Sequence, residues 1–263
     1  MAGSAQYGVR LLHMGDGEVP GPEVFWMSDW DQWYTLAFQA VLIEGPGVKA
    51  LVNTGPAEDL TAMNGQWATF LGERAAMKRE PGQWMPEQLA ALGIAPEEIT
   101  HVLLTPLQAY TTANVPLFTE AEICVTERGW THFHRTKVHP HDDRWTSISQ
   151  PVLHWLVDEA WDRVRLLGDE DEIAPGLRTW WSGAHHRASM VVEVDTPAGV
   201  VTVTDSYFTR RNLDTDHPIG ICENIYEAMA AQERVRRVAE VPLTVYDRDQ
   251  LEAYPDGVVV PAP

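Results

Sequence analysis

The stretch AVLIEGPGVKALV, residues 40–52, decides the fold class. Two apolar, β-branched runs flank Gly45-Pro46-Gly47, and glycine and proline favour tight turns between strands. The stretch therefore predicts a β-hairpin. Because the rest of the chain alternates strands with helices, a hairpin requires antiparallel pairs beside parallel ones. We therefore expect a layered α/β fold with mixed sheets.

Helices and strands alternate on the C-terminal side of this hairpin. Helical spacing and helix-start residues predict helices at 86–92, 151–163 and 223–240, with short helical turns at 96–100 and from 247. Apolar runs predict strands at 101–105, 121–126, 177–181, 190–194, 200–204 and 241–245. Because no linker or low-complexity stretch divides the sequence, we expect residues 1–263 to form one domain.

The composition excludes several functional classes. The 263 residues include 38 acidic and 19 basic ones, so the formal net charge is −19. Nucleic acids and anionic bilayers both bind basic surfaces, and we therefore expect neither nucleic acid nor a membrane as a partner. No apolar run approaches the length of a transmembrane helix, and the N-terminus does not resemble a signal peptide. The two cysteines suit a reducing compartment, which predicts a cytoplasmic protein.

Two histidine clusters are candidate sites. The first contains His132, His134, His139 and His141, whose His-x-His spacing could bind a transition metal, although a solvated loop is the simpler interpretation. The second is GAHHRAS, residues 183–189, which lies between two expected strands, and Asp205 ends the next strand. A loop histidine beside a strand-terminal aspartate can form an acid–base pair or hold a metal. The alternative is a surface histidine and an aspartate that caps a turn.

Other residue types give weaker signals. The chain has no G-x-S-x-G elbow, and Cys124 lies in an apolar run where a thiol is usually inert. Trp26 and Trp30 lie close together near the N-terminus. They could form an aromatic wall over an apolar substrate pocket, and packing in the core or under a loop explains them equally well.

Five segments, in order, resemble the metallo-β-lactamase fold superfamily and, within it, the N-acyl homoserine lactonase branch. They are KALVNTG (49–55), ITHVLLTPLQAYTTANVPLF (99–118), GAHHRAS (183–189), TVTDSYF (202–208) and VPLTVYD (241–247). The resemblance implies an αββα sandwich, in which two mixed sheets face each other and helices cover the outer faces. It also implies a lactonase-like ancestor and a small-molecule substrate.

The chain departs from the family pattern at the metal-binding motif. The H-x-H-x-D-H signature falls on Pro106, Gln108, Tyr110 and Thr111, the early aspartate on Asn53, and the last histidine on Tyr246. Only Asp205 and either His185 or His186 keep the family's residue types. A catalytic zinc typically has three protein ligands. We therefore expect no dinuclear metal centre and no other cofactor.

These residues predict a metal-independent enzyme that hydrolyses a lactone, ester or amide. His185 or His186, oriented by Asp205, would act as the base, and Tyr110 and Tyr246 would donate hydrogen bonds to a carbonyl oxygen. The expected substrate-binding residues are Gln108, Thr111, Asn53, Trp26 and Trp30. Lyase or isomerase chemistry needs the same proton-transfer groups, so these residues fit that chemistry as well.

Two other interpretations remain at this point. The chain could be a non-catalytic relative that binds a small molecule or a partner chain in the family's pocket. It could also be a hydrolase with a single metal, held by His185, His186 and Asp205 or by the residues 132–141. The acidic surface favours a soluble monomer but permits a homodimer.

Overall fold

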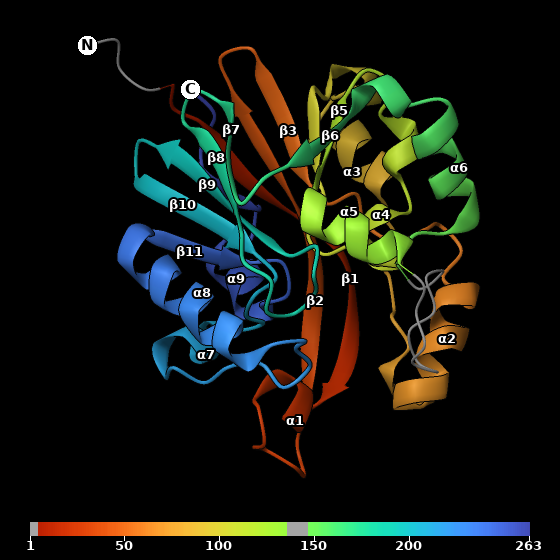
Figure 1. Cartoon of the computed structure of the whole chain (residues 1–263), viewed down its shortest axis with the longest axis vertical. Helices are drawn as coiled ribbons and strands as arrows, with labels where there is room; N and C mark the ends of the chain where they lie inside the picture. The colour runs from red at the N-terminus through yellow and green to blue at the C-terminus, as the bar shows by residue number, and fades with distance from the viewer. Residues whose placement is uncertain (1–4, 136–146) are drawn as a thin grey trace.

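Two β-sheets face each other, and helices pack on their outer sides (Figure 1). The structure is a computed structural model that describes residues 5–135 and 147–263. Residues from both sheets fill the core between them, among them Leu51, Val102, Val192 and Val203, which are all fully buried. This is the αββα arrangement that the family resemblance implies, and it agrees with the layered α/β fold that the residue patterns predict.

The first sheet has the strand order β12-β1-β2-β3-β4-β5-β6. Its centre is the hairpin of β2 (Trp33–Gly45) and β3 (Val48–Val52), which confirms the predicted turn at residues 45–47. The remaining strands are β1 (Gly8–Pro20), β4 (His101–Leu103), β5 (Glu122–Thr126), β6 (Val164–Leu167) and β12 (Val258–Val260). The pairs from β3 to β6 are parallel and those from β12 to β3 are antiparallel, so the sheet is mixed.

The second sheet has the order β11-β10-β9-β8-β7. Its strands are β7 (Glu170–Ala174), β8 (Leu177–Trp181), β9 (Met190–Thr196), β10 (Gly199–Thr204) and β11 (Val241–Thr244). Only the pair of β10 and β11 is parallel. The strands predicted at 177–181, 190–194, 200–204 and 241–245 are confirmed to within two residues.

Nine α-helical segments belong to the described residues. They are α1 (Gly21–Val24), α2 (Thr61–Leu71), α3 (Met85–Ala91), α4 (Ala109–Thr112), α5 (Glu127–His134), α6 (Gln150–Asp158), α7 (Arg210–Asp214), α8 (Ile225–Val238) and α9 (Arg248–Ala253). Within this part of the chain, no helix is long and apolar enough to cross a membrane.

Two sequence predictions about helices need correction. The helix expected over 151–163 ends at Asp158, because the amides of Glu159 and Ala160 both bond to the Trp155 carbonyl and close it; a separate 3₁₀ turn covers Trp161–Arg163. His132 and His134 lie in helix α5 and not in a loop, since Thr126 caps that helix by accepting from the Gly129 amide. His139 and His141 lie outside the described residues.

A candidate acid–base site at the strand ends

The loops that follow β4, β8 and β10 meet where the two sheets face each other. Thr105 Oγ1, after β4, accepts a hydrogen bond from the Met190 amide at 2.9 Å and thereby links the two sheets. The 182–189 loop turns through Gly183 (φ +57°) and Ala184 (φ +65°). The Ala184 carbonyl accepts from the amides of Glu223 and Asn224, so the loop is fixed to the segment before α8. The predicted position of this loop, at a strand end, is confirmed.

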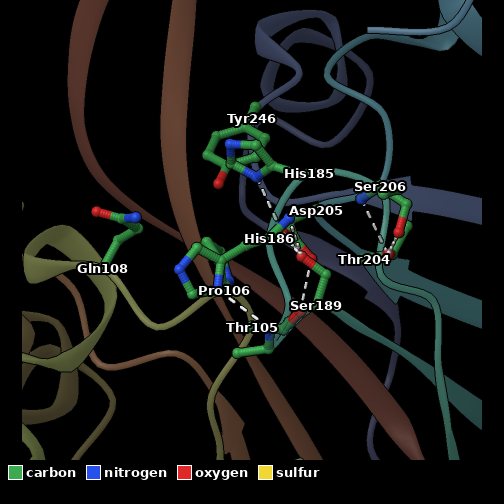
Figure 2. A network of polar contacts seen from close by, with 12 residues as sticks. Thr105, Pro106, Gln108, His185, His186, Ser189, Thr204, Asp205, Ser206 and Tyr246 are labelled. Carbon is green, nitrogen blue, oxygen red and sulfur yellow. Dashed lines mark hydrogen bonds and ion pairs between the residues drawn. The ribbon is translucent and has the colours of Figure 1, made fainter. Parts of the chain in front are cut away.

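Asp205 is the centre of the polar network in Figure 2, and its side chain is fully buried. Thr105 Oγ1 donates to its Oδ1 at 2.6 Å, Ser189 Oγ donates to its Oδ2 at 2.5 Å, and His185 Nδ1 lies 2.9 Å from the same oxygen. Three hydrogen-bond donors thus satisfy the oxygens of this buried side chain. Because Nδ1 then carries the proton, Nε2 of His185 is the proton acceptor.

The structure distinguishes the two neighbouring histidines. His185 contacts Asp205, and its ring lies edge-on to Phe208 and Tyr246, at centroid distances of 5.0 and 6.0 Å. His186 turns the other way. Its Nδ1 accepts from the Ala188 amide at 3.0 Å and its ring is 6.2 Å from that of His132. Of the two, His185 therefore has the geometry of an aspartate-oriented base.

Tyr110 and Tyr246 form a hydroxyl pair beside His185. Their phenolic oxygens are 3.0 Å apart, and burial raises the pKa of both side chains. Both phenols are therefore protonated at neutral pH. One hydroxyl donates to the other, so one O–H hydrogen is left to donate to a ligand oxygen. Trp67 of α2 packs against Tyr110 with a ring-centroid distance of 5.7 Å.

The predicted substrate-binding residues differ in where they lie. The amide of Asn53 exchanges two hydrogen bonds with the Thr105 backbone, at 2.7 and 2.8 Å, and Thr111 Oγ1 donates to the Pro106 carbonyl at 2.6 Å. These buried side chains shape the β4–α4 loop. Gln108 is half-buried, and Figure 2 shows it to one side of the Asp205 network.

The two tryptophans do not form a buried wall. Trp26 and Trp30 follow α1 and are 49% and 65% exposed. The Trp26 amide and carbonyl bond to Pro218 and His217, which places this turn against the 217–222 loop. Their large exposed area shows that they do not pack in the core, because the turn that carries them projects beyond the sheets (Figure 1). The aromatic wall over a substrate pocket stays a prediction.

Two residues of the network were not singled out from the sequence. Thr105 and Ser189 both donate to Asp205. Thr105 ends the strand expected at 101–105, and Ser189 ends the segment GAHHRAS. The available signal was their place at strand ends, where polar side chains of different strands meet. Hydroxyl residues are common in such places, so this signal is weak.

The described side chains around Asp205 are a poor donor set for a metal centre. No group of three or more His, Cys, Asp or Glu side chains with suitable spacing occurs within residues 5–135 and 147–263. Both Asp205 oxygens already accept hydrogen bonds from protein groups. A catalytic zinc typically takes three protein ligands. Proline at 106 offers no side-chain donor, and the hydroxyl of Thr111 is bound to backbone.

Comparison with known proteins identifies the fold. No protein-family model matches the chain. The N-acyl homoserine lactonase AiiB of Agrobacterium fabrum is 25% identical over 182 residues, which are 67% of this chain and 65% of that protein. The match thus spans slightly less than two thirds of the relative's length.

Solved structures extend the likeness to nearly the whole chain. An N-acyl homoserine lactone hydrolase, solved with N-hexanoyl-L-homoserine at its catalytic metal center, has a TM-score of 0.77 at 15% identity, over 95% of this chain and 97% of that one. The hydrolase AbOPH of the beta lactamase superfamily has a TM-score of 0.68 at 14% identity, over 100% of this chain and 94% of that one. The chain therefore has the metallo-β-lactamase fold, which confirms the resemblance drawn from its five segments.

Proposed function

We propose that the chain is a hydrolase of a lactone, ester or amide that uses the His185–Asp205 pair as its base and needs no metal. The observation that carries the proposal is the hydrogen bond of 2.9 Å between His185 Nδ1 and a fully buried Asp205 carboxylate. This contact leaves Nε2 of His185 to accept a proton. The similarity to a lactonase supports a cyclic ester as the first substrate class to test.

The reaction assigns one role to each group. A water oxygen attacks the substrate carbonyl carbon while His185 Nε2 accepts the water proton. The free O–H hydrogen of the Tyr110–Tyr246 pair donates to the carbonyl oxygen as it gains negative charge. When the carbon–oxygen bond of the lactone breaks, the proton held by His185 passes to the leaving oxygen. Water and lactone thus give one hydroxy acid.

A cavity next to α4, the helix that carries Tyr110, offers space for an apolar part of the substrate. It has a volume of about 350 Å³ and lies between α2 and α4, where Leu60, Met63, Ala109 and Ala113 line it. Tyr110 and Tyr246 do not line this cavity themselves. We expect an acyl or alkyl substituent here, because the lining is mostly apolar.

The first prediction concerns Asp205→Asn. Asparagine would remove the charge that stabilises protonated His185, so we expect turnover to fall by about 10³-fold or more. The assay follows a panel of N-acyl homoserine lactones, aryl esters and aryl amides with protein prepared in a chelator. Asp249→Asn, an exposed position on α9, is the matched control and should retain full activity.

The outcomes separate three interpretations. Turnover that is unchanged by the chelator and lost in Asp205→Asn supports the proposal. Turnover that appears only when a divalent metal is added would show a metal hydrolase instead. If wild-type protein gives no product but a panel compound raises its melting temperature, the chain is a binding protein.

A further inference from the structure

A second carboxyl group, that of Glu23, lies close enough to His185 to interact with it electrostatically. Glu23 belongs to α1, the short segment at the tip of the long β1–β2 ribbon (Figure 1). Its backbone carbonyl accepts hydrogen bonds from the amides of Gly220 and Ile221, at 2.9 and 3.1 Å. These bonds hold the tip against the loop before α8.

This loop connects the Glu23 tip with the His185 loop. Its next residues, Glu223 and Asn224, donate their amides to the Ala184 carbonyl, directly before His185. Gly220 permits the close approach, because a Cβ atom there would lie 1.6 Å from the Pro22 carbonyl oxygen. The segment 220–224 is therefore bonded to Glu23 at one end and to Ala184, the neighbour of His185, at the other.

The carboxyl group of Glu23 has few competing partners. His185 is the only charged or titratable side chain of the described residues that acts electrostatically on it. Other charged groups around this tip are bound elsewhere: Asp29 to Tyr34 and Arg211, His217 to the Trp26 carbonyl, and Glu223 to Arg187. Glu23 is half-buried, and no hydrogen bond from another described residue shifts the pKa of its carboxyl group.

We propose that Glu23 is the second proton carrier of this site: it protonates the leaving oxygen in place of His185, which takes the proton of the attacking water and passes it to Glu23 afterwards. The inference rests on the proposed function. The O–H bond of Glu23 breaks as its proton bonds to the leaving oxygen and the substrate carbon–oxygen bond breaks. The proton on His185 Nε2 then returns to the Glu23 carboxylate, so water and lactone give the hydroxy acid and both groups recover their starting forms.

The surroundings of Glu23 suit this role. Burial raises the pKa of its carboxyl group to about 7, and the nearby His185 opposes that rise. At neutral pH both the acid and the carboxylate are therefore populated. A group that donates and then regains a proton works best when its pKa is near the working pH.

A carboxyl titration tests the contact without any substrate. The chain is labelled with ¹³C at its glutamate carboxyl groups and followed by NMR from pH 4 to pH 9, and Glu23→Gln identifies the Glu23 signal. We expect this signal to titrate near pH 7 and to move to higher pH in His185→Gln, because the electrostatic effect of His185, which lowers the pKa of Glu23, is removed. A signal that does not respond to His185→Gln overturns the inference. If that variant does not fold, His185→Phe, which keeps an aromatic ring beside Phe208, replaces it.

Kinetics tests the role. We expect Glu23→Gln to lower kcat by about 10²-fold or more with little change in KM, and to remove the part of the pH–rate profile near pH 7. Glu97→Gln, an exposed carboxyl, should behave as wild type. If Glu23→Gln keeps the wild-type profile while Asp205→Asn is inactive, the inference is wrong and the proposed function stands. If both variants keep full activity, both fail.

Discussion

Tyr110 and Tyr246 form a hydrogen bond to each other through their hydroxyl groups. The hydrogen bond that the pair can donate to a substrate therefore depends on both hydroxyls. The two oxygens lie 3.0 Å apart inside an aromatic cluster with Phe38, whose ring is 4.9 Å from that of Tyr110. Two phenols hold two hydrogens, and one is used between them. Removing either hydroxyl therefore breaks the same chain of donors.

We expect Tyr246→Phe to lower kcat by about 10²-fold, which is a typical cost of losing one donor to a developing oxyanion. Tyr110→Phe should cost nearly as much. The double variant should be little worse than either single one, since the hydroxyls act as a unit. Phe38→Leu, which repacks the cluster without removing a hydroxyl, is the control. Fully additive losses would show that the two hydroxyls act separately.

Helix α8 and the segment before it are linked to the candidate site by ion pairs. Arg187 of the 182–189 loop bonds to Glu223 at 2.6 Å and also pairs with Glu227 of α8. Glu227 in turn accepts from the Ala184 amide at 3.2 Å. The start of the helix therefore holds the backbone on which His185 is mounted.

Arg187→Gln should separate the loop from α8. We expect kcat to fall about tenfold, because His185 would no longer be held in one orientation. The free energy of unfolding should change by only about 1 kcal/mol or less, since the ion pairs are partly exposed to water. Arg210→Gln, which breaks an exposed pair with Asp214 on α7, should change neither quantity. A large loss of stability without a fall in kcat would contradict this role.

Local sequence patterns predict some helices and strands of the structure and miss others. The β2–β3 hairpin and the strands β8 to β10 are marked by apolar runs and turn residues within a few positions. Strand β1 is harder to recognise, since a bulge between His13 and Gly15 interrupts its alternation. Helix α5 is also concealed, because it is short and only Trp130 and Phe133 of its eight residues are large and apolar.

Across the whole molecule, the candidate site combines residues that are far apart in the sequence. Asp205 and the 183–189 loop could be predicted, because each lies at a strand end that the pattern marks. The choice of His185 over His186 depends on the left-handed turn at Gly183 and Ala184, which no residue type at position 184 announces. The approach of Glu23 depends on its hydrogen bonds to Gly220 and Ile221, which are about 200 residues away in the sequence, and only the folded chain shows it.

The stability of the whole molecule should fall as the pH rises through neutrality. Burial raises the pKa of Glu23 from 4.5 to about 7 and also raises the pKa of Asp247. The native state thus binds more protons than the unfolded state between about pH 4.5 and 7, so the unfolding free energy decreases as the pH rises through that window. The formal charge of −19 adds repulsion in the same direction. Urea unfolding should therefore give a higher stability at pH 5.5 than at pH 8.

Glu23→Gln isolates the contribution of the Glu23 carboxyl group to this pH dependence of the unfolding free energy. The amide resembles the protonated acid, so the variant should be about 2 kcal/mol more stable than wild type at pH 8, after an allowance for the partial exposure of Glu23. The difference should disappear near pH 4.5, where the wild-type carboxyl is protonated in the folded state. Added salt at 0.5 M should weaken the general repulsion and leave this difference nearly unchanged, because a half-buried group is screened less than the surface. A variant that is equally stable at both pH values would show that Glu23 is solvated like any surface glutamate, and a carboxyl with an ordinary pKa would not serve as the proton donor of a neutral-pH hydrolase.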